Sequence, residues 1–201
     1  MGFRTMLVGF IFILFNINLG NINILPDVIG YGLLFLGSIT LRRKFDNEFF
    51  SRVKSASLIL IILSSLDLLK KHTEVLYVLN NSQTIEGKVF SFLFYLTIVS
   101  LFLYCVYNLC RGIEKEANLI ESKGLASKSR KVFKIFAIYQ LAFFLFLGIG
   151  TIGGSQEFHF SGQAALFIFI VVAIILIYVF VQMFSLLNQA EKTFIASYNE
   201  K

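Results

Sequence analysis

The feature that most constrains this chain is the recurrence of apolar runs of about 20 residues along most of its 201 positions. A run of that length forms a helix that crosses a hydrocarbon core about 30 Å thick. Hydrophobic side chains make up 57% of the chain and charged ones 15%, whereas an ordinary soluble domain has roughly 45 to 50% and about 25%. The composition excludes a typical soluble domain and leaves too few residues outside the membrane for a folded catalytic domain.

We predict an all-α, polytopic transmembrane helical bundle that forms one domain over residues 1–201. The last three apolar segments are the clearest, whereas asparagines interrupt the first and the second has only about 15 residues, roughly 22 Å of helix. Two arrangements stay open for residues 4–41: two full crossings, or a re-entrant pair with its tip buried in protein or lining a wet cavity. The six segments cover residues 4–22, 27–41, 55–69, 89–110, 132–152 and 164–187.

The distribution of basic residues predicts the orientation. Fifteen of the 18 lysines and arginines lie at the N-terminus, in the second and fourth connections or in the C-terminal tail, and the other three are Lys70, Lys71 and Lys88. The positive-inside rule then places both termini in the cytoplasm. The expected partners are the lipid bilayer and anionic headgroups at the cytoplasmic face, with a membrane or cytoplasmic protein partner as the alternative. The basic residues form no stripe of the kind that binds nucleic acid.

Two cytoplasmic connections have helical patterns. Over residues 42–54, Phe45, Phe49, Phe50 and Val53 share one face, which predicts a short interfacial helix. In the next cytoplasmic connection, apolar residues at helical spacing predict that the fourth span continues out of the membrane. Gly124 is the expected stop before the chain turns back into the fifth span.

The most distinctive stretch is NINLGNINILPDVIGYG, residues 16–32. Amides alternate with apolar residues on both sides of Gly20, which predicts an extended hairpin or a tight loop. A helix then begins at Pro26 and Asp27, where the carboxylate suits the positive end of the helix dipole. Gly30 and Gly32 would allow a close approach of backbones. Two interpretations stay open, a polar pocket for an ion or small solute, or amides that satisfy one another. The candidate site comprises Asn16, Asn18, Asn21, Asn23, Pro26, Asp27, Gly30 and Tyr31.

At this stretch the chain resembles a family of small, uncharacterised integral membrane proteins of Gram-positive bacteria. In that family an apolar span leads through a polar turn into a Leu-Pro-Asp, Ile-Gly-Tyr hairpin, and a looser match is CRGI, residues 110–113. The resemblance implies a location in the bacterial plasma membrane and no particular mechanism. The matched residues are Leu25, Pro26, Asp27, Ile29, Gly30 and Tyr31.

Other candidate sites have structural interpretations. Gly150 and Gly154, four residues apart, predict a close helix contact. Cys105 and Cys110 point about 140° apart on a helix and predict packing residues instead of a disulfide or metal site. Glu157 and His159 would need further ligands to bind a metal, so an exposed histidine is expected. We therefore predict no cofactor and no metal.

No sequence motif of an enzyme is present, and ionisable residues within the apolar segments are scarce. We interpret the chain as a non-enzymatic accessory or regulatory membrane protein. The alternative is a component of a small-solute or ion transporter or channel. A wet path from the asparagines and Asp27 to mid-depth polar residues such as Gln140 would favour that alternative.

Overall fold

The computed structural model contains six helices and one two-stranded ribbon among the residues it describes, which are 2–14, 18–19, 22–23, 27–72, 85–152 and 162–199. In chain order these elements are α1 (Gly2–Leu14), β1 (Asn18–Leu19), β2 (Ile22–Asn23), α2 (Asp27–Phe45), α3 (Glu48–His72), α5 (Ile85–Leu119), α6 (Lys123–Ile152) and α7 (Gly162–Asn199).

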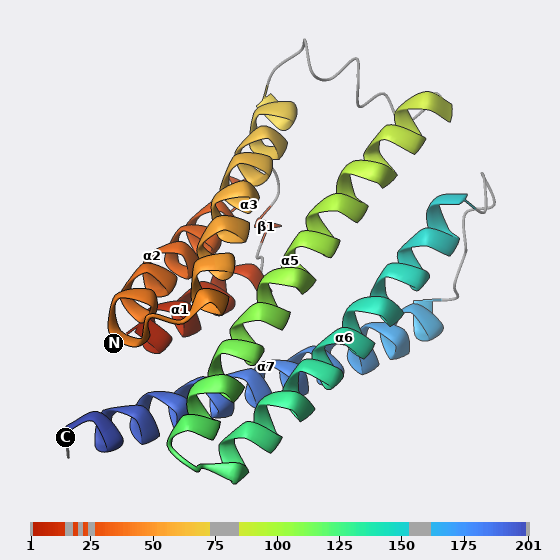
Figure 1. Cartoon of the computed structure of the whole chain (residues 1–201). Coiled ribbons are helices and arrows are strands. Elements are labelled where there is room, and N and C mark those ends of the chain that lie inside the picture. The colour runs from red at the N-terminus through yellow and green to blue at the C-terminus, as the bar shows by residue number, and fades with distance from the viewer. Residues whose placement is uncertain are drawn as a thin grey trace.

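The helices pack in a closed order. Each helix packs on the next one along the chain, and α7 packs on both α6 and α1. Figure 1 shows α1, α2 and α3 gathered on one side, the α5–α6 hairpin beside them, and α7 crossing behind to reach α1. The start of α1, the α2–α3 corner, the α5–α6 turn and the end of α7 lie at the same end of the bundle, which we call the basic end (Figure 1).

Three of the described helices contain a stretch long and apolar enough to cross a membrane. These stretches are Glu48–Leu68 in α3, Val89–Leu119 in α5 and Ile170–Ser197 in α7. The all-helical transmembrane prediction is confirmed at this level, whereas six membrane segments remain a prediction. Helix α1 is apolar but has 13 residues, about 20 Å at 1.5 Å per residue, so it is too short to cross alone.

The predicted first segment, residues 4–22, is wrong as a single helix. Helix α1 ends at Leu14, and β1 and β2 pair in antiparallel register, with Asn18 opposite Asn23 and Leu19 opposite Ile22. The extended hairpin predicted from the alternating amides is therefore confirmed. Asparagine side chains compete for backbone hydrogen bonds, and a period of two suits a strand, so the helix does not continue through this stretch.

The interfacial helix predicted over residues 42–54 is also wrong. Helix α2 ends within this range at Phe45, and α3 begins at Glu48 after the two corner residues Asp46 and Asn47. Asp46 has a positive φ of 44°. The Asp46 amide donates to the Arg42 carbonyl at 3.0 Å, which closes the last turn of α2. Phe50 and Val53 are fully buried, because this face packs inside the bundle and not on lipid.

The α5–α6 turn forms as expected but not at Gly124. Helix α5 runs to Leu119 and α6 begins at Lys123, so Gly124 lies inside α6. The left-handed residue is Glu121, with a φ of 58°. The Ser122 amide donates to the Ala117 carbonyl at 2.8 Å and the Glu121 amide to the Asn118 carbonyl at 3.1 Å, the two bonds of a Schellman motif.

Helices α1 and α2 are joined by a seam of four glycines, Gly2, Gly9, Gly30 and Gly37. A Cβ atom on Gly30 would lie 2.9 Å from the Gly9 carbonyl oxygen, and one on Gly9 would lie 2.7 Å from the Gly30 oxygen. Gly2 and Gly37 face each other in the same reciprocal way, at 2.8 and 2.7 Å. The close approach predicted for Gly30 is confirmed. That for Gly32 is wrong, because a Cβ there meets nothing within 4 Å.

We expect Gly30→Ala to lower the free energy of unfolding by about 1 to 3 kcal/mol, because its Cβ would lie 2.6 Å from Ile13 Cγ1 and must push α1 away. Gly32→Ala, two residues along the same helix, is the matched control. It should be neutral or stabilise the protein by up to about 1 kcal/mol through helix propensity. Unfolding in mixed detergent micelles measures both changes. Equal effects of the two variants would contradict the conclusion that α1 and α2 pack closely at Gly30.

Candidate functional site

The structure describes part of the candidate site predicted at the asparagine-rich stretch. Asn18 is paired with Asn23 in the ribbon, Asp27 is the first residue of α2, and Gly30 lies in the glycine seam. Asn16, Asn21 and Pro26 lie outside the described residues, as do Gly154, Glu157 and His159. Gly150 lies within α6, but its surroundings are not described, so the predicted Gly150–Gly154 contact stays a prediction.

Asp27 and three tyrosines lie within electrostatic range of one another in a chain of pairs, and we call these four residues the Asp27–tyrosine cluster. The Asp27 carboxylate acts electrostatically on the hydroxyls of Tyr31 in α2 and Tyr95 in α5, and Tyr139 in α6 acts on Tyr95. Tyr31 is buried, and its ring packs edge-on against Phe102 with centroids 5.8 Å apart. Helices α2, α5 and α6 thus place one carboxylate and three hydroxyls in the same region of the bundle. Gln140, adjacent to Tyr139, is buried too.

The two cysteines occupy packing positions, as predicted. Both are free thiols buried in α5. The Cys105 sulfur lies 3.5 Å from the Ser57 hydroxyl of α3, and the Cys110 carbonyl accepts a hydrogen bond of 2.7 Å from Ser129 of α6. They therefore help join α5 to the helices on either side of it.

At the basic end, Asn47 fixes the α2–α3 corner to α5. Its side-chain oxygen accepts the Phe49 amide at 3.0 Å and caps α3. Its amide nitrogen donates to the Glu116 carboxylate at 2.7 Å and to the Gly112 carbonyl at 3.3 Å. All of these bonds are buried or partly buried. The sequence offered one signal that we did not use, an asparagine directly before a helix that begins with glutamate.

Glu114 and Lys128 hold the long α5–α6 hairpin at the same end. The Glu114 carboxylate accepts Arg111 at 3.0 Å and Arg130 at 3.2 Å, which connects the two helices across their turn. The Lys128 ammonium donates to Ser185 at 2.7 Å and to Gln189 at 2.8 Å, which connects α6 to α7. The charge of Lys128 therefore points toward α7.

Four phenylalanines from four helices fill the centre of the basic end. Phe3, Phe45, Phe50 and Phe194 come from α1, α2, α3 and α7, and five pairs of their rings lie with centroids 5.3 to 6.4 Å apart. Phe50 also covers Gly112, where a Cβ would lie 2.6 Å from the ring. This aromatic cluster is the hydrophobic contact that joins the first helix to the last.

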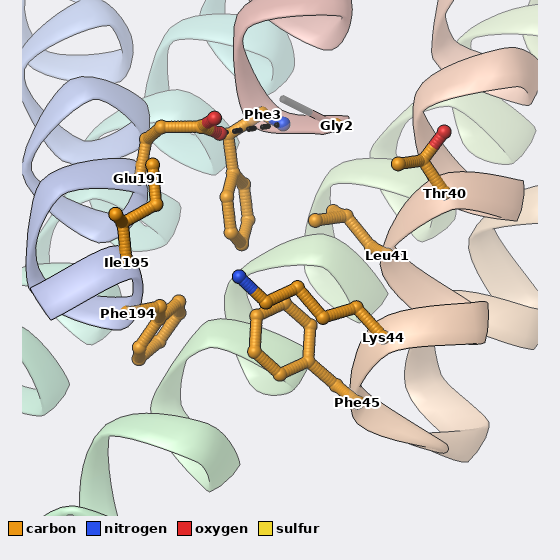
Figure 2. A pocket seen from close by; sticks show the side chains of 9 residues that line it. All are labelled: Gly2, Phe3, Thr40, Leu41, Lys44, Phe45, Glu191, Phe194 and Ile195. Atoms are coloured by element: carbon orange, nitrogen blue, oxygen red, sulfur yellow. Dashed lines mark hydrogen bonds between the residues drawn. The ribbon is translucent and has the colours of Figure 1, made fainter. Parts of the chain in front are cut away.

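A small pocket opens beside the aromatic cluster (Figure 2). The carboxylate of Glu191 borders it and accepts the backbone amide of Phe3 at 3.2 Å, a buried bond between α7 and the start of α1. From α2, the Lys44 side chain extends into the pocket in Figure 2, and its ammonium lies 5.6 Å from the Phe45 ring centroid. The nine lining residues are Gly2, Phe3, Thr40, Leu41, Lys44, Phe45, Glu191, Phe194 and Ile195.

Within the described part of the chain, no group of three or more His, Cys, Asp or Glu side chains is placed to hold a metal ion. Comparison of the chain with protein-family models, with curated proteins and with solved structures gives no match. Functional inference therefore depends on the geometry of the two polar regions, the Asp27–tyrosine cluster and the basic end.

We expect Asn47→Asp to lower the free energy of unfolding by about 2 to 3 kcal/mol. The aspartate oxygen can still cap α3, but the variant loses both donated hydrogen bonds and places a second carboxylate against Glu116. Unfolding in mixed micelles measures the change. A variant as stable as the wild type would mean that Asn47 serves only as a helix cap.

Proposed function

We propose that this chain is a non-enzymatic accessory or regulatory protein of the bacterial plasma membrane that gathers anionic lipid headgroups around its basic end. On this proposal the chain is multi-pass, and the basic end faces the cytoplasm. The family resemblance at residues 25–31 supports the bacterial location, and the distribution of basic residues supports the orientation.

The observation that carries the proposal is the separation of charge at the basic end. Glu114, Glu116 and Glu191 are only 9%, 2% and 3% exposed, and each accepts hydrogen bonds or ion pairs inside the bundle. Three other carboxylates at this end, Asp46, Glu48 and Glu121, are exposed, and Glu48 pairs with Arg52. The exposed acidic residues are outnumbered by the lysines and arginines. The lysines and arginines with exposed side chains are Arg4, Arg42, Arg43, Lys44, Arg52, Arg111, Lys115, Lys123, Arg130, Lys131, Lys134 and Lys192.

This separation makes the surface more positive than the formal net charge of +6 suggests. The buried carboxylates are bonded inside the bundle and cannot contact headgroups, whereas exposed ammonium and guanidinium groups can contact them directly. Each basic residue near an anionic membrane surface contributes about 1 kcal/mol of attraction. Because these basic residues lie on several helices, they favour an anionic lipid belt over a single soluble partner.

The test is lipid retention in nanodiscs of equal phosphatidylglycerol and phosphatidylcholine, read by native mass spectrometry. We expect the wild type to retain phosphatidylglycerol preferentially. Replacing Lys123, Lys131 and Lys134 by glutamine should reduce that preference at least about tenfold, since three charges contribute about 3 kcal/mol. The control replaces the same three lysines by arginine and should keep the preference.

Lys128 stays unchanged in this experiment because it bonds Ser185 and Gln189. A wild type without preference for phosphatidylglycerol would contradict the proposal. So would a reporter fused after Lys123 that reads external. A soluble protein that co-purifies with the wild type and is lost from the glutamine variant would favour the partner alternative.

Transport of a cation or small solute is a second candidate function, and the Asp27–tyrosine cluster is the observation that favours it. A carboxylate and hydroxyls between helices are groups that can bind a cation or pass a proton. Asp27 also has a structural role at the start of α2, where a negative charge is favourable by about 0.3 to 1 kcal/mol.

Asp27→Asn separates these roles, because the amide removes the charge and keeps the size of the side chain. We expect the variant to stay folded, with at most about 1 kcal/mol lost. We also expect proton and Na⁺ flux into proteoliposomes to equal that of empty vesicles for both proteins. Flux by the wild type that disappears in Asp27→Asn would establish the second candidate instead.

A further inference from the structure

The pocket between α1, α2 and α7 combines two kinds of polar group that one ligand rarely satisfies together. The Lys44 ammonium is a cation that binds phosphate, and the Glu191 carboxylate is an acceptor for hydroxyl groups. The walls between them are the rings of Phe3, Phe45 and Phe194. A ligand that fits must carry a negative group and a hydroxyl donor close to an apolar part.

The size of the pocket limits what enters it. The space open to the centre of a water molecule is about 20 Å³, which holds about one water molecule. A single hydroxyl or phosphate oxygen fits this space, and an acyl chain or a nucleotide base does not. The rest of the ligand must therefore lie along the surface of the neighbouring helices.

Along α2 that surface changes from apolar to polar to charged. A phospholipid changes in the same order, from its acyl chain through its glycerol to its phosphate. Leu36, Thr40 and Lys44 are spaced four residues apart on α2, so they follow one another along one face. Leu36 is 55% exposed, the Thr40 hydroxyl donates to the Leu36 carbonyl at 3.1 Å, and Lys44 is exposed. Ile195, 40% exposed on α7, adds an apolar surface on the opposite side of the pocket.

We propose that this pocket is a binding site for one glycerophospholipid whose anionic headgroup carries a hydroxyl, the chemistry of phosphatidylglycerol. Lys44 binds the phosphate, a headgroup hydroxyl enters the pocket and donates to Glu191, and an acyl chain lies along Leu36. This site deepens the proposed function, because it adds one specific lipid to a general anionic belt. The exposed leucine and the aromatic walls favour a lipid over a free glycerol phosphate.

The experiment uses the full chain in detergent, titrated with phosphatidylglycerol and read by native mass spectrometry. We expect one lipid to bind more tightly than all others, and Lys44→Ala to weaken it about tenfold. Arg43→Ala is the matched control. It removes the neighbouring exposed charge, which does not line the pocket, and should change the affinity less than about twofold.

Glu191→Gln tests whether a headgroup hydroxyl of the lipid donates a hydrogen bond to residue 191. The glutamine oxygen can still accept a hydrogen bond from the Phe3 backbone amide, so this variant should stay folded. If Lys44→Ala fails to fold, Lys44→Arg serves as a second variant and should keep lipid binding. The wild type should prefer phosphatidylglycerol to phosphatidic acid, which has no headgroup hydroxyl. The glutamine variant should lose that preference.

The remaining outcomes separate this site from the proposed function. Equal losses in Lys44→Ala and Arg43→Ala would overturn the site and leave the general anionic belt standing. A wild type that binds no anionic lipid would overturn both. Tight binding of sn-glycerol 3-phosphate in the absence of lipid would mean that the ligand is a soluble molecule, and would contradict the proposal that it is a lipid.

Discussion

The burial of three glutamates at the basic end is the constraint on which the rest of the structure depends. An ionised carboxylate taken out of water costs several kcal/mol unless hydrogen bonds and ion pairs replace the lost solvation. Glu116 obtains a donor from the α2–α3 corner, Glu114 from both sides of the α5–α6 turn, and Glu191 from the start of α1. Each of these hydrogen bonds or ion pairs joins elements that would otherwise separate. The three buried glutamates therefore specify which helices pack together.

Apolar contacts act on this polar frame in a different way. Lipid is as apolar as leucine, so hydrophobicity alone gives membrane helices little reason to choose one another. The glycine seam lets the backbones of α1 and α2 approach closely, and the aromatic cluster fills the space where four helices meet. Close packing therefore determines the distances between helices. The buried carboxylates determine which helices pack on one another.

Local pattern predicted much of this fold. The apolar runs located the cores of the helices, and the alternating amides predicted the ribbon of Asn18 and Asn23, because both depend on neighbours in the sequence. The corner at Asp46 was missed because Phe45 and Phe50 have the same spacing in a lipid-facing helix and in a buried one. Their buried partners, Phe194 and Gly112, come from distant segments.

The residues of the candidate site also fall into two groups, those that local sequence could predict and those that only the packing of helices brings in. Asp27 and Tyr31 could be selected from one short stretch, but Tyr95 and Tyr139 join them only through the packing of α2, α5 and α6. The pocket at Lys44 and Glu191 had no sequence signal, because its residues come from both ends of the chain. Gly124 misled the prediction of the turn, since hydrogen bonding and not residue type placed the left-handed conformation at Glu121.

The bond between Phe3 and Glu191 also sets an order of events during synthesis. Its two residues are 188 positions apart, and chains grow at about 5 to 20 residues per second. The first helix is therefore made about 10 to 40 seconds before the carboxylate that receives its amide exists. During that interval α1 is held by the glycine seam to α2 and, as they are made, by Phe50 of α3 and Phe102 of α5. The packing of α1 on these helices must therefore persist as an early intermediate until the last helix arrives.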